Sequence, residues 1–409
     1  MDKTRFKSII EKHVRPMFTG SELSEEDENP AWKKRRVFLR NICEMIVRHP
    51  GVPGKCFCLK RSQDFEAADA DFVEGLVDQL SKLESIADTP LLDDLVNPLL
   101  RRTVAVRVCP DASEVVAAVL GQYESWAEQT YEGRRIAAAV GVETDNVAPT
   151  GAKLIEVFRS PFGSVLANGL ETFIKVGRSG DLIGYQEYES HPDDASRFAP
   201  LRFCRLAAWS RDSRVGLGLS RNGEILVFAN QRLIFAKRRG IWRHFTHSAL
   251  TKRIALQNSF KPDLCKAVYQ TSLDVSFAKT GGGIALIRRT KANDLATAGI
   301  IGPKDRVGDS HLKGQSLKII IGKPFHELDR RLRQDIVAMD GATIIDYTGK
   351  VLAAGAIIKV DGGSDGGGRL LAARTLGKYG LGIKISSDGK IEAYTGEPVP
   401  DQKPLFEVG

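Results

Sequence analysis

A carboxylate and two small residues in the C-terminal third form a pattern that could bind a metal ion and a phosphate group. Asp340 stands between an expected helix and an expected strand, and Gly341 and Ala342 follow it. Because Gly341 has no Cβ atom, another segment of backbone can approach this turn closely. A carboxylate in such a position is a natural ligand for a divalent cation that bridges phosphates. These residues therefore predict a phosphate-binding turn with Asp340 as a metal ligand.

A glycine-rich loop follows the Asp340 turn further along the chain. Residues 362–368 have the sequence GGSDGGG and run directly into an expected helix led by Arg369. The start of a helix offers free N–H donors and the positive end of a dipole, and a guanidinium group adds a fork of donors. Asp-Gly is also a common turn dipeptide, and many glycine-rich loops only reverse the chain. It is the order of the two features, and their occurrence together, that favours a binding site.

The elements that must position both features alternate along the stretch 262–397. Apolar-periodic segments alternate there with short apolar runs, which predicts helices alternating with strands. Such an alternation usually gives a sheet covered by helices, so we expect a mixed sheet with the Asp340 turn and the loop at one of its ends. We expect helices at 264–279, 325–338 and 369–379, a polar connection at 291–313, and strands at 284–287, 317–321, 343–346, 351–360, 382–386 and 391–394.

The first two thirds of the chain divide into a mainly helical part and a part rich in strands. The Asn222-Gly223 pair between two apolar runs is typical of a hairpin turn. The expected fold class is α/β, or α+β overall, with a mainly helical region at 1–150, a β-meander region at 151–261 and a mixed α/β domain at 262–409. In the first two regions we expect helices at 31–48, 67–86, 91–100 and 111–127, and strands at 56–59, 154–158, 173–176, 215–219, 225–228 and 233–235.

The composition is that of a globular protein, with 42% of the 409 residues hydrophobic and 27% charged. No run approaches the ~18 apolar residues that cross a bilayer, and the N-terminus lacks the apolar core of a signal peptide. Six cysteines are too few for a disulfide framework, which fits a reducing compartment. We therefore expect a cytoplasmic protein with no membrane partner. The net charge of +8 favours a polyanion, but it does not choose between nucleotides and nucleic acid.

The order of the two features resembles that of the diadenylate cyclases. In that family an Asp-Gly-Ala motif follows a helix, and a later loop carries Arg-His-Arg-Ala-Ala at the start of another helix. Here Asp340, Gly341 and Ala342 match the first motif, and residues 368–373 resemble the second. Residues 278–287 resemble the first helix and strand of that fold. The likeness covers roughly a third of the chain, and its motifs are moderately specific when found together.

The second motif departs from the family pattern where the phosphates would be held. Leu370 and Leu371 stand in place of the histidine and the second arginine, and Gly368 stands where a threonine is common. Losing a charge-assisted phosphate contact costs about 1.5–3 kcal/mol, so a cyclase without both groups would be strongly slowed. This pattern resembles more closely the degenerate cyclase-related domains that are proposed as nucleotide sensors, the DACNV type among them.

The resemblance implies a nucleotide site and a role for each matched residue. In the family the aspartate of the first motif binds metal and helps to activate the 3′-hydroxyl, a catalytic role that falls to Asp340 only if the chain is a cyclase. The backbone of Gly341 and Ala342 would lie by the adenine and ribose, and Arg369 would hold phosphate. A serine late in the fold touches phosphate, with Ser386 or Ser387 as its counterpart. The implied nucleotide-binding residues are Asp340, Gly341, Ala342, Ile358, Gly367, Gly368, Arg369 and Ser386.

Three functions remain open at this point. The first is a sensor that binds an adenine nucleotide or a cyclic dinucleotide, acts on an effector protein and forms a homo-oligomer. The second is an active diadenylate cyclase that joins two ATP molecules into cyclic di-AMP with Mg²⁺ or Mn²⁺. The third is a basic nucleic-acid-binding protein, marked by a steep salt dependence of binding. Two further pairs, His244 with His247 and Cys56 with Cys58, could supply metal ligands, but no third ligand stands near them and we expect structural roles.

Overall fold

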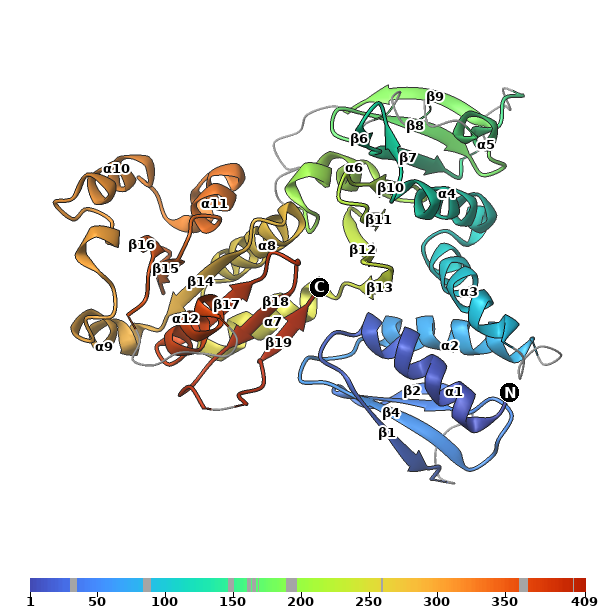
Figure 1. The fold of residues 1–409 in the computed structure, drawn as a ribbon, viewed down its shortest axis with the longest axis horizontal. Helices are drawn as coiled ribbons and strands as arrows, with labels where there is room; N and C mark the ends of the chain where they lie inside the picture. Colours follow the sequence, from blue (N-terminus) through green and yellow to red (C-terminus); the bar gives the residue numbers. More distant parts are fainter. Residues whose placement is uncertain are drawn as a thin grey trace. The chain divides into compact units, whose positions relative to one another are not determined.

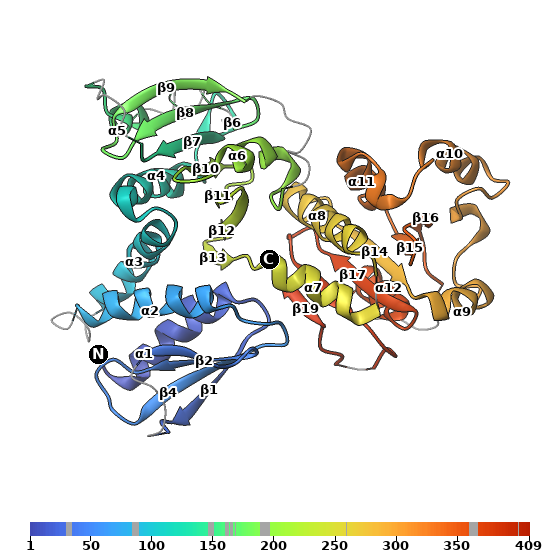
Figure 2. The same ribbon diagram turned by 180° about the vertical axis from the view of Figure 1, so that it is seen from behind.

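The chain forms two compact units, Met1–Thr246 and His247–Gly409 (Figures 1 and 2). The computed structural model describes residues 1–409 except 30–34, 84–89, 146–150, 160–162, 164–166, 168, 189–196, 259, 360–366 and 400. Both units combine helices with sheets, which confirms the expected α+β class. In the described part of the chain, no helix is both long and apolar enough to span a membrane.

The N-terminal unit begins with an antiparallel sheet of strand order β1-β4-β3-β2. The strand expected at 56–59 is confirmed as part of β4, whereas the helix expected at 31–48 is wrong for the residues that the structure describes. The apolar residues there belong to two strands, and Val37 pairs with Val47 across a hairpin whose turn is closed by Asn41. The elements are α1 (Lys3–Ile9), β1 (Glu22–Asp27), β2 (Val37–Asn41), β3 (Glu44–Arg48), β4 (Lys55–Lys60) and α2 (Ala67–Ser81).

A second sheet of this unit has the strand order β13-β12-β11-β10-β7-β8-β9. The expected hairpin is confirmed, because β10 pairs antiparallel with β11 on either side of Asn222 and Gly223. The strand expected at 154–158 is instead the short helix α5, in which Leu154 and Phe158 are buried one turn apart while Ile155 is exposed. The strands are β5 (Thr130–Tyr131), β6 (Arg134–Arg135), β7 (Ala138–Glu143), β8 (Thr172–Gly177), β9 (Leu182–Glu187), β10 (Val215–Leu219), β11 (Ile225–Ala229), β12 (Arg232–Arg238) and β13 (Ile241–His244).

Helices join the two sheets of the N-terminal unit into one apolar core that reaches from Phe6 to Trp242. The helix expected at 91–100 continues through Pro98 as α3. Phe72 of α2 packs against Phe235 of β12 with ring centroids 5.0 Å apart, so the first sheet and the second are parts of one packed body. The remaining helices are α3 (Leu91–Val108), α4 (Ser113–Trp126), α5 (Leu154–Phe158) and α6 (Cys204–Trp209).

The C-terminal unit is built on a sheet of strand order β16-β15-β14-β17-β18-β19, in which β14 and β15 are parallel and the other neighbours are antiparallel. Helix α12 packs on β14 and β17, and α8 packs with α7 and α11 (Figure 1). The elements are α7 (His247–Asn258), α8 (Pro262–Ala278), β14 (Gly282–Ile287), α9 (Ala292–Thr297), α10 (Leu312–Ile320), α11 (Arg330–Val337), β15 (Ala342–Asp346), β16 (Val351–Ala356), α12 (Gly368–Gly377), β17 (Gly380–Ile385), β18 (Ile391–Tyr394) and β19 (Phe406–Val408).

The segment between β14 and α11 differs most from expectation. The strand predicted at 317–321 is wrong, because residues Leu312–Ile320 form helix α10. Only Gly314 and Leu317 of this helix are buried, which is a helical spacing, and two isoleucines that suggested a strand are exposed. The same segment meets the β16 side of the sheet through isolated bridges, Ile301 with Ile358 and Arg306 with Ala353.

Candidate functional site

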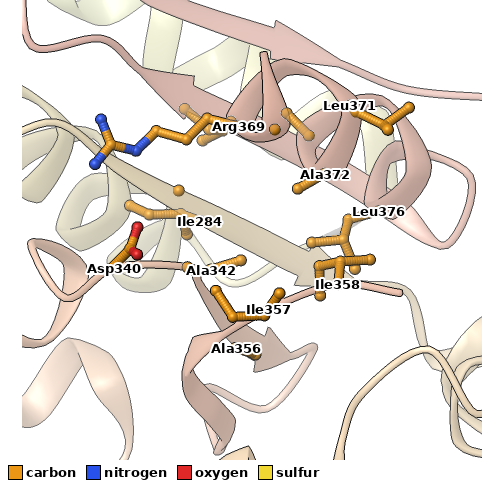
Figure 3. Close-up of a pocket in the computed structure, with 15 residues that line it drawn as sticks. Ile284, Asp340, Ala342, Ala356, Ile357, Ile358, Arg369, Leu371, Ala372 and Leu376 are labelled. Atoms are coloured by element: carbon orange, nitrogen blue, oxygen red, sulfur yellow. The ribbon is translucent and has the colours of Figure 1, made fainter. Parts of the chain in front are cut away.

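A cavity of about 290 Å³ lies between α12, the ends of β14 and β15, and the chain that leaves β16 (Figure 3). Its volume is at the lower end of the range in which small ligands bind. The backbone and side chains around it come from five separate stretches of the sequence. The cavity is lined by Gly283, Ile284, Asp340, Gly341, Ala342, Ala356, Ile357, Ile358, Gly368, Arg369, Leu371, Ala372, Ala373, Leu376 and Ile383.

Asp340 reaches this cavity because the turn before β15 packs directly on the end of β16. Gly341 has φ +108°, and a Cβ atom there would lie 2.6 Å from the carbonyl carbon of Gly355 and 2.7 Å from the amide nitrogen of Ala356. Any other residue would force the turn away from β16, since such distances are far inside van der Waals contact. The carboxylate of Asp340 is exposed. No hydrogen bond joins it to another described residue, so its two oxygens can accept hydrogen bonds from a ligand.

Arg369 is placed by the start of α12 and by Gly281, which directly precedes β14. A Cβ atom at Gly281 would lie 2.4 Å from Nη1 of Arg369 and 3.3 Å from the carbonyl oxygen of Ile385. The missing side chain of Gly281 therefore leaves room for the guanidinium group. Gly367 precedes the helix with φ +79°, and the first turn of α12 leaves N–H groups without intrahelical acceptors. A guanidinium group beside a helix N-terminus is suited to an anion.

The cavity has a charged end and an apolar end. Figure 3 shows the carboxylate of Asp340 and the guanidinium of Arg369 at the same end, and Ile358 and Leu376 at the other. Asp340 and Arg369 are the charged residues among those that line the cavity, and the rest are glycine, alanine, leucine and isoleucine. The arrangement can hold a ligand with an apolar face and an anionic group.

One wall of the cavity is fixed by a lysine of α10. Lys313 Nζ donates to Oδ1 of Asp305 at 2.6 Å and to the carbonyl oxygen of Gly355 at 3.0 Å. Oδ2 of the buried Asp305 in turn accepts from the Ile357 amide at 3.4 Å. Because Gly355 packs against the Asp340 turn and Ile357 lines the cavity, this network connects the wall to α10.

Most of the residues predicted from the sequence meet at this cavity. Those brought together are Asp340, Gly341, Ala342, Ile358, Gly368 and Arg369. Gly367 immediately precedes the lining residues, and Ser386 lies beyond them in a turn where its N–H donates to the carbonyl oxygen of Lys390. Residues 362–366 of the glycine-rich loop lie outside the described residues.

Apart from Ala342 and Ile358, the sequence interpretation did not assign the apolar residues that line the cavity. The missed residues of α12 have a recognisable signal, because Ala372 and Leu376 follow Gly368 at intervals of one helical turn and so share its face. Gly283 lies at the cavity because β14 and β15 are parallel neighbours. The sequence around Gly283 does not indicate this pairing of strands. The missed residues are Gly283, Ile284, Ala356, Ile357, Leu371, Ala372, Ala373, Leu376 and Ile383.

The two other pairs considered as metal ligands have structural contacts. His244 pairs with buried Asp69, and Nδ1 of His247 lies 3.0 Å from the hydroxyl of buried Tyr269. Cys56 and Cys58 are free, buried thiols, and burial raises the pKa of Cys58 to about 11. The described residues contain no group of three or more His, Cys, Asp or Glu side chains that could hold a metal ion.

Comparison with known proteins finds matches among solved structures only. No protein-family model matches the chain, and no curated protein matches it. Among solved structures, a crystal structure of a double mutant of DacA from Staphylococcus aureus matches with 19% identity and a TM-score of 0.21, over 32% of this chain and 81% of that one. With a TM-score this low, the match carries no conclusion about the fold or the chemistry of this chain.

Proposed function

We propose that the C-terminal unit is a nucleotide-binding module that senses a cyclic dinucleotide or an adenine nucleotide. The observation that carries the proposal is the shape of its cavity, which has an apolar end for a base and Arg369 beside a helix N-terminus for a phosphate. Apolar cavities with a small number of well-placed polar groups are the usual form of small-molecule sites. The position of Asp340 at the charged end suits a ribose hydroxyl or a phosphate-bound cation.

The charge of the cavity favours a ligand with few charges. Arg369 is the cation among the described lining residues, and Leu371, another lining residue, stands where the family motif has a second arginine. A triphosphate brought to this cavity would leave part of its charge unpaired, which is costly in a partly apolar environment. Each phosphodiester of a cyclic dinucleotide carries a single charge. We therefore favour the cyclic dinucleotide over ATP.

A divalent cation, Mg²⁺ or Mn²⁺, would be held here only together with the ligand. Asp340 offers one carboxylate, and the described residues contain no group of three or more His, Cys, Asp or Glu side chains that could hold the ion without the ligand. Divalent cations that bind nucleotides often take one or two carboxylates and complete their shell with phosphate oxygens and water. The cavity fits that arrangement, in which Asp340 would hold the ion and the ion would offset part of the phosphate charge.

The alternative is a divergent diadenylate cyclase, and the meeting of Asp340 and Arg369 in one cavity is the observation that favours it. The deciding experiment incubates the purified protein with ATP and Mn²⁺ and follows the products by chromatography. The sensor proposal expects no turnover. Multiple-turnover formation of cyclic di-AMP that disappears in Asp340→Asn would replace it by the cyclase.

Arg369→Ala is expected to weaken cyclic di-AMP binding about 10- to 100-fold. The substitution removes a charge-assisted contact of about 1.5–3 kcal/mol, which corresponds to that range of affinity. Isothermal titration calorimetry measures the change. Lys378→Ala is the matched control, since it removes a cation at the end of the same helix that does not line the cavity. If both variants bound cyclic di-AMP as tightly as the unmodified protein, Arg369 would not contact the ligand.

Leu371→Arg is expected to raise the affinity for ATP relative to cyclic di-AMP by about tenfold, since a second guanidinium can pair with the additional phosphates. Leu371 lines the cavity and is only partly buried, so a longer side chain has room. Competition between the two nucleotides, followed by calorimetry, gives the ratio. Leu371→Met controls for the change in length. An equal change in the ratio of ATP affinity to cyclic di-AMP affinity in Leu371→Met and Leu371→Arg would contradict the argument from charge.

A further inference from the structure

Helix α10 presents an apolar face to the solvent. Leu312 is 82% exposed, Ile319 is 83% exposed and Ile320 is 53% exposed. Leu312 and Ile319 are seven residues apart and therefore lie on the same face of the helix. The opposite side holds the buried Gly314 and Leu317. Exposed apolar patches with a polar rim mark interaction sites, so this face is suited to a partner.

The charged residues of α10 itself are lysines, while acidic residues lie next to the helix: Lys313 pairs with Asp305, and Asp309 and Glu327 lie just outside the segment 310–326. Residues 310–326, all of which the structure describes, contain three lysines and no aspartate or glutamate. Lys318 and Lys323 are exposed and form no ion pair with any described residue. A cationic rim around an apolar face complements a partner in which leucine-like side chains are flanked by carboxylates.

We propose that α10 is the docking surface for an acidic amphipathic segment of an effector protein. The apolar side chains of the segment would cover Leu312, Ile319 and Ile320, and its carboxylates would pair with Lys318 and Lys323. Helices that lie in membrane interfaces combine a wide apolar face of Trp, Phe or Leu with a polar face rich in Lys and Arg. The side of α10 opposite its exposed apolar residues instead holds the buried Gly314 and Leu317, so a protein segment is the better match.

The same helix carries the lysine that fixes the wall of the nucleotide cavity. Lys313 donates to the carbonyl oxygen of Gly355 at 3.0 Å. A Cβ atom at Gly355 would lie 3.1 Å from the carbonyl oxygen of Asp340 and 3.3 Å from Nζ of Lys313. A shift of α10 on docking would therefore move the wall beside Asp340. This coupling rests on the proposed function of the cavity, whereas the docking surface itself does not.

The docking surface is tested with the full chain and a fluorescent synthetic peptide made of leucine, alanine and glutamate in an amphipathic helical pattern. Anisotropy should show saturable binding that Ile319→Asp weakens at least about tenfold. Lys318→Glu should weaken binding and reduce its salt dependence. Leu256→Asp is the matched control, because Leu256 is 72% exposed on α7 of the same unit, and it should bind as the unmodified protein does.

The docking proposal would be wrong if the unmodified protein showed no saturable binding of the acidic peptide. It would also be wrong if a peptide with lysine in place of glutamate bound equally tightly. The third contradicting result is an affinity of Ile319→Asp for the acidic peptide equal to that of the unmodified protein. Phosphatidylserine vesicles are the second probe. Binding of vesicles that depends on Ile319, without binding of the acidic peptide, would assign α10 to a membrane surface instead.

The coupling is tested by measuring cyclic di-AMP affinity with and without the peptide. Linkage requires the nucleotide to change peptide affinity by the same factor. Lys313→Met should remove this mutual effect and Lys313→Arg should retain it, since arginine can still donate to Asp305 and Gly355. Mutual effects of equal size in all three proteins would exclude Lys313 as the positioning residue. Peptide binding without any nucleotide binding would leave the docking surface standing and contradict the proposed function.

Discussion

Asp274→Asn is expected to lower the free energy of unfolding of the C-terminal unit by about 3–5 kcal/mol. Asp274 of α8 accepts two hydrogen bonds from Arg330 of α11, at 2.7 and 2.8 Å, and the side chains are 0% and 2% exposed. Asparagine keeps the shape of the side chain but leaves the guanidinium charge of Arg330 buried without its counter-charge. Such a loss costs more than the pair itself contributes.

A second guanidinium group on α11 makes this carboxylate still more important. Burial, and then the charge of Arg330, lowers the pKa of Arg333 to about 10, while Asp274 acts in the opposite direction. Arg333 is 5% exposed. Removing the charge of Asp274 therefore leaves two buried cations close together on one helix. Because α11 ends just before the Asp340 turn, the substitution should also weaken nucleotide binding.

Urea denaturation followed by circular dichroism measures the effect of Asp274→Asn. Asp335→Asn is the matched control on α11, because its pair with Arg331 is exposed at 61% and 72% and should contribute at most about 0.5 kcal/mol. The double variant Asp274→Leu with Arg330→Met should recover much of the loss, since apolar residues of similar volume can replace a buried ion pair. Equal destabilisation by the Asp274 and Asp335 variants would show that the buried pair has no special role.

The cavity residues that could be predicted from the sequence are those that local backbone geometry requires. Gly341 is needed because the turn touches the backbone of Gly355, and Arg369 leads a helix that a glycine begins. Such constraints leave recognisable residue types at one place in the chain. The apolar wall depends instead on which strands become neighbours, as when β14 pairs with β15 and brings Gly283 beside Ala342. No local pattern contains that information.

The wrong secondary-structure predictions have a similar cause. Residues 317–321 have a β-branched run that favours a strand, but tertiary contacts bury Gly314 and Leu317 on one helical face and leave Ile319 exposed. In the stretch 31–48 the apolar residues fit a helical spacing only because two short strands of a hairpin follow each other closely. A short apolar run does not distinguish a strand from a buried segment of helix. The exposed isoleucines of α10 are therefore the residues that wrongly favoured a strand. They also belong to the docking surface that we propose.

A buried ionic cluster in the N-terminal unit should make stability depend on pH. Asp69 of α2 is 0% exposed, and Nη2 of Arg61 lies 3.2 Å from its Oδ2. His244 of β13 contacts the other carboxylate oxygen, and the Glu66 amide donates to Asp69 at 2.8 Å. The cluster therefore connects the start of α2 to the edge strand of the second sheet.

Burial raises the pKa of Asp69, but the contacts with His244 and Arg61 outweigh burial and leave this pKa below its usual value. A folded-state pKa below the unfolded one means that the ionised carboxylate stabilises the fold. This stability is fully present above the unfolded pKa of about 3.9. It is lost as the pH falls from there through the lower folded pKa, where Asp69 becomes protonated.

Asp69→Asn is accordingly expected to destabilise the N-terminal unit by about 3–5 kcal/mol at neutral pH, with a smaller difference from the unmodified protein below about pH 4. Asparagine can still accept from the Glu66 amide, so the substitution isolates the charge from the helix cap. Urea unfolding at a series of pH values gives the difference. Asp71→Asn, which alters a 45% exposed carboxylate on the same helix, should cost less than about 1 kcal/mol at every pH. A difference for Asp69→Asn that stays constant down to the acid limit would mean that packing, and not the ionised carboxylate, holds α2 against β13.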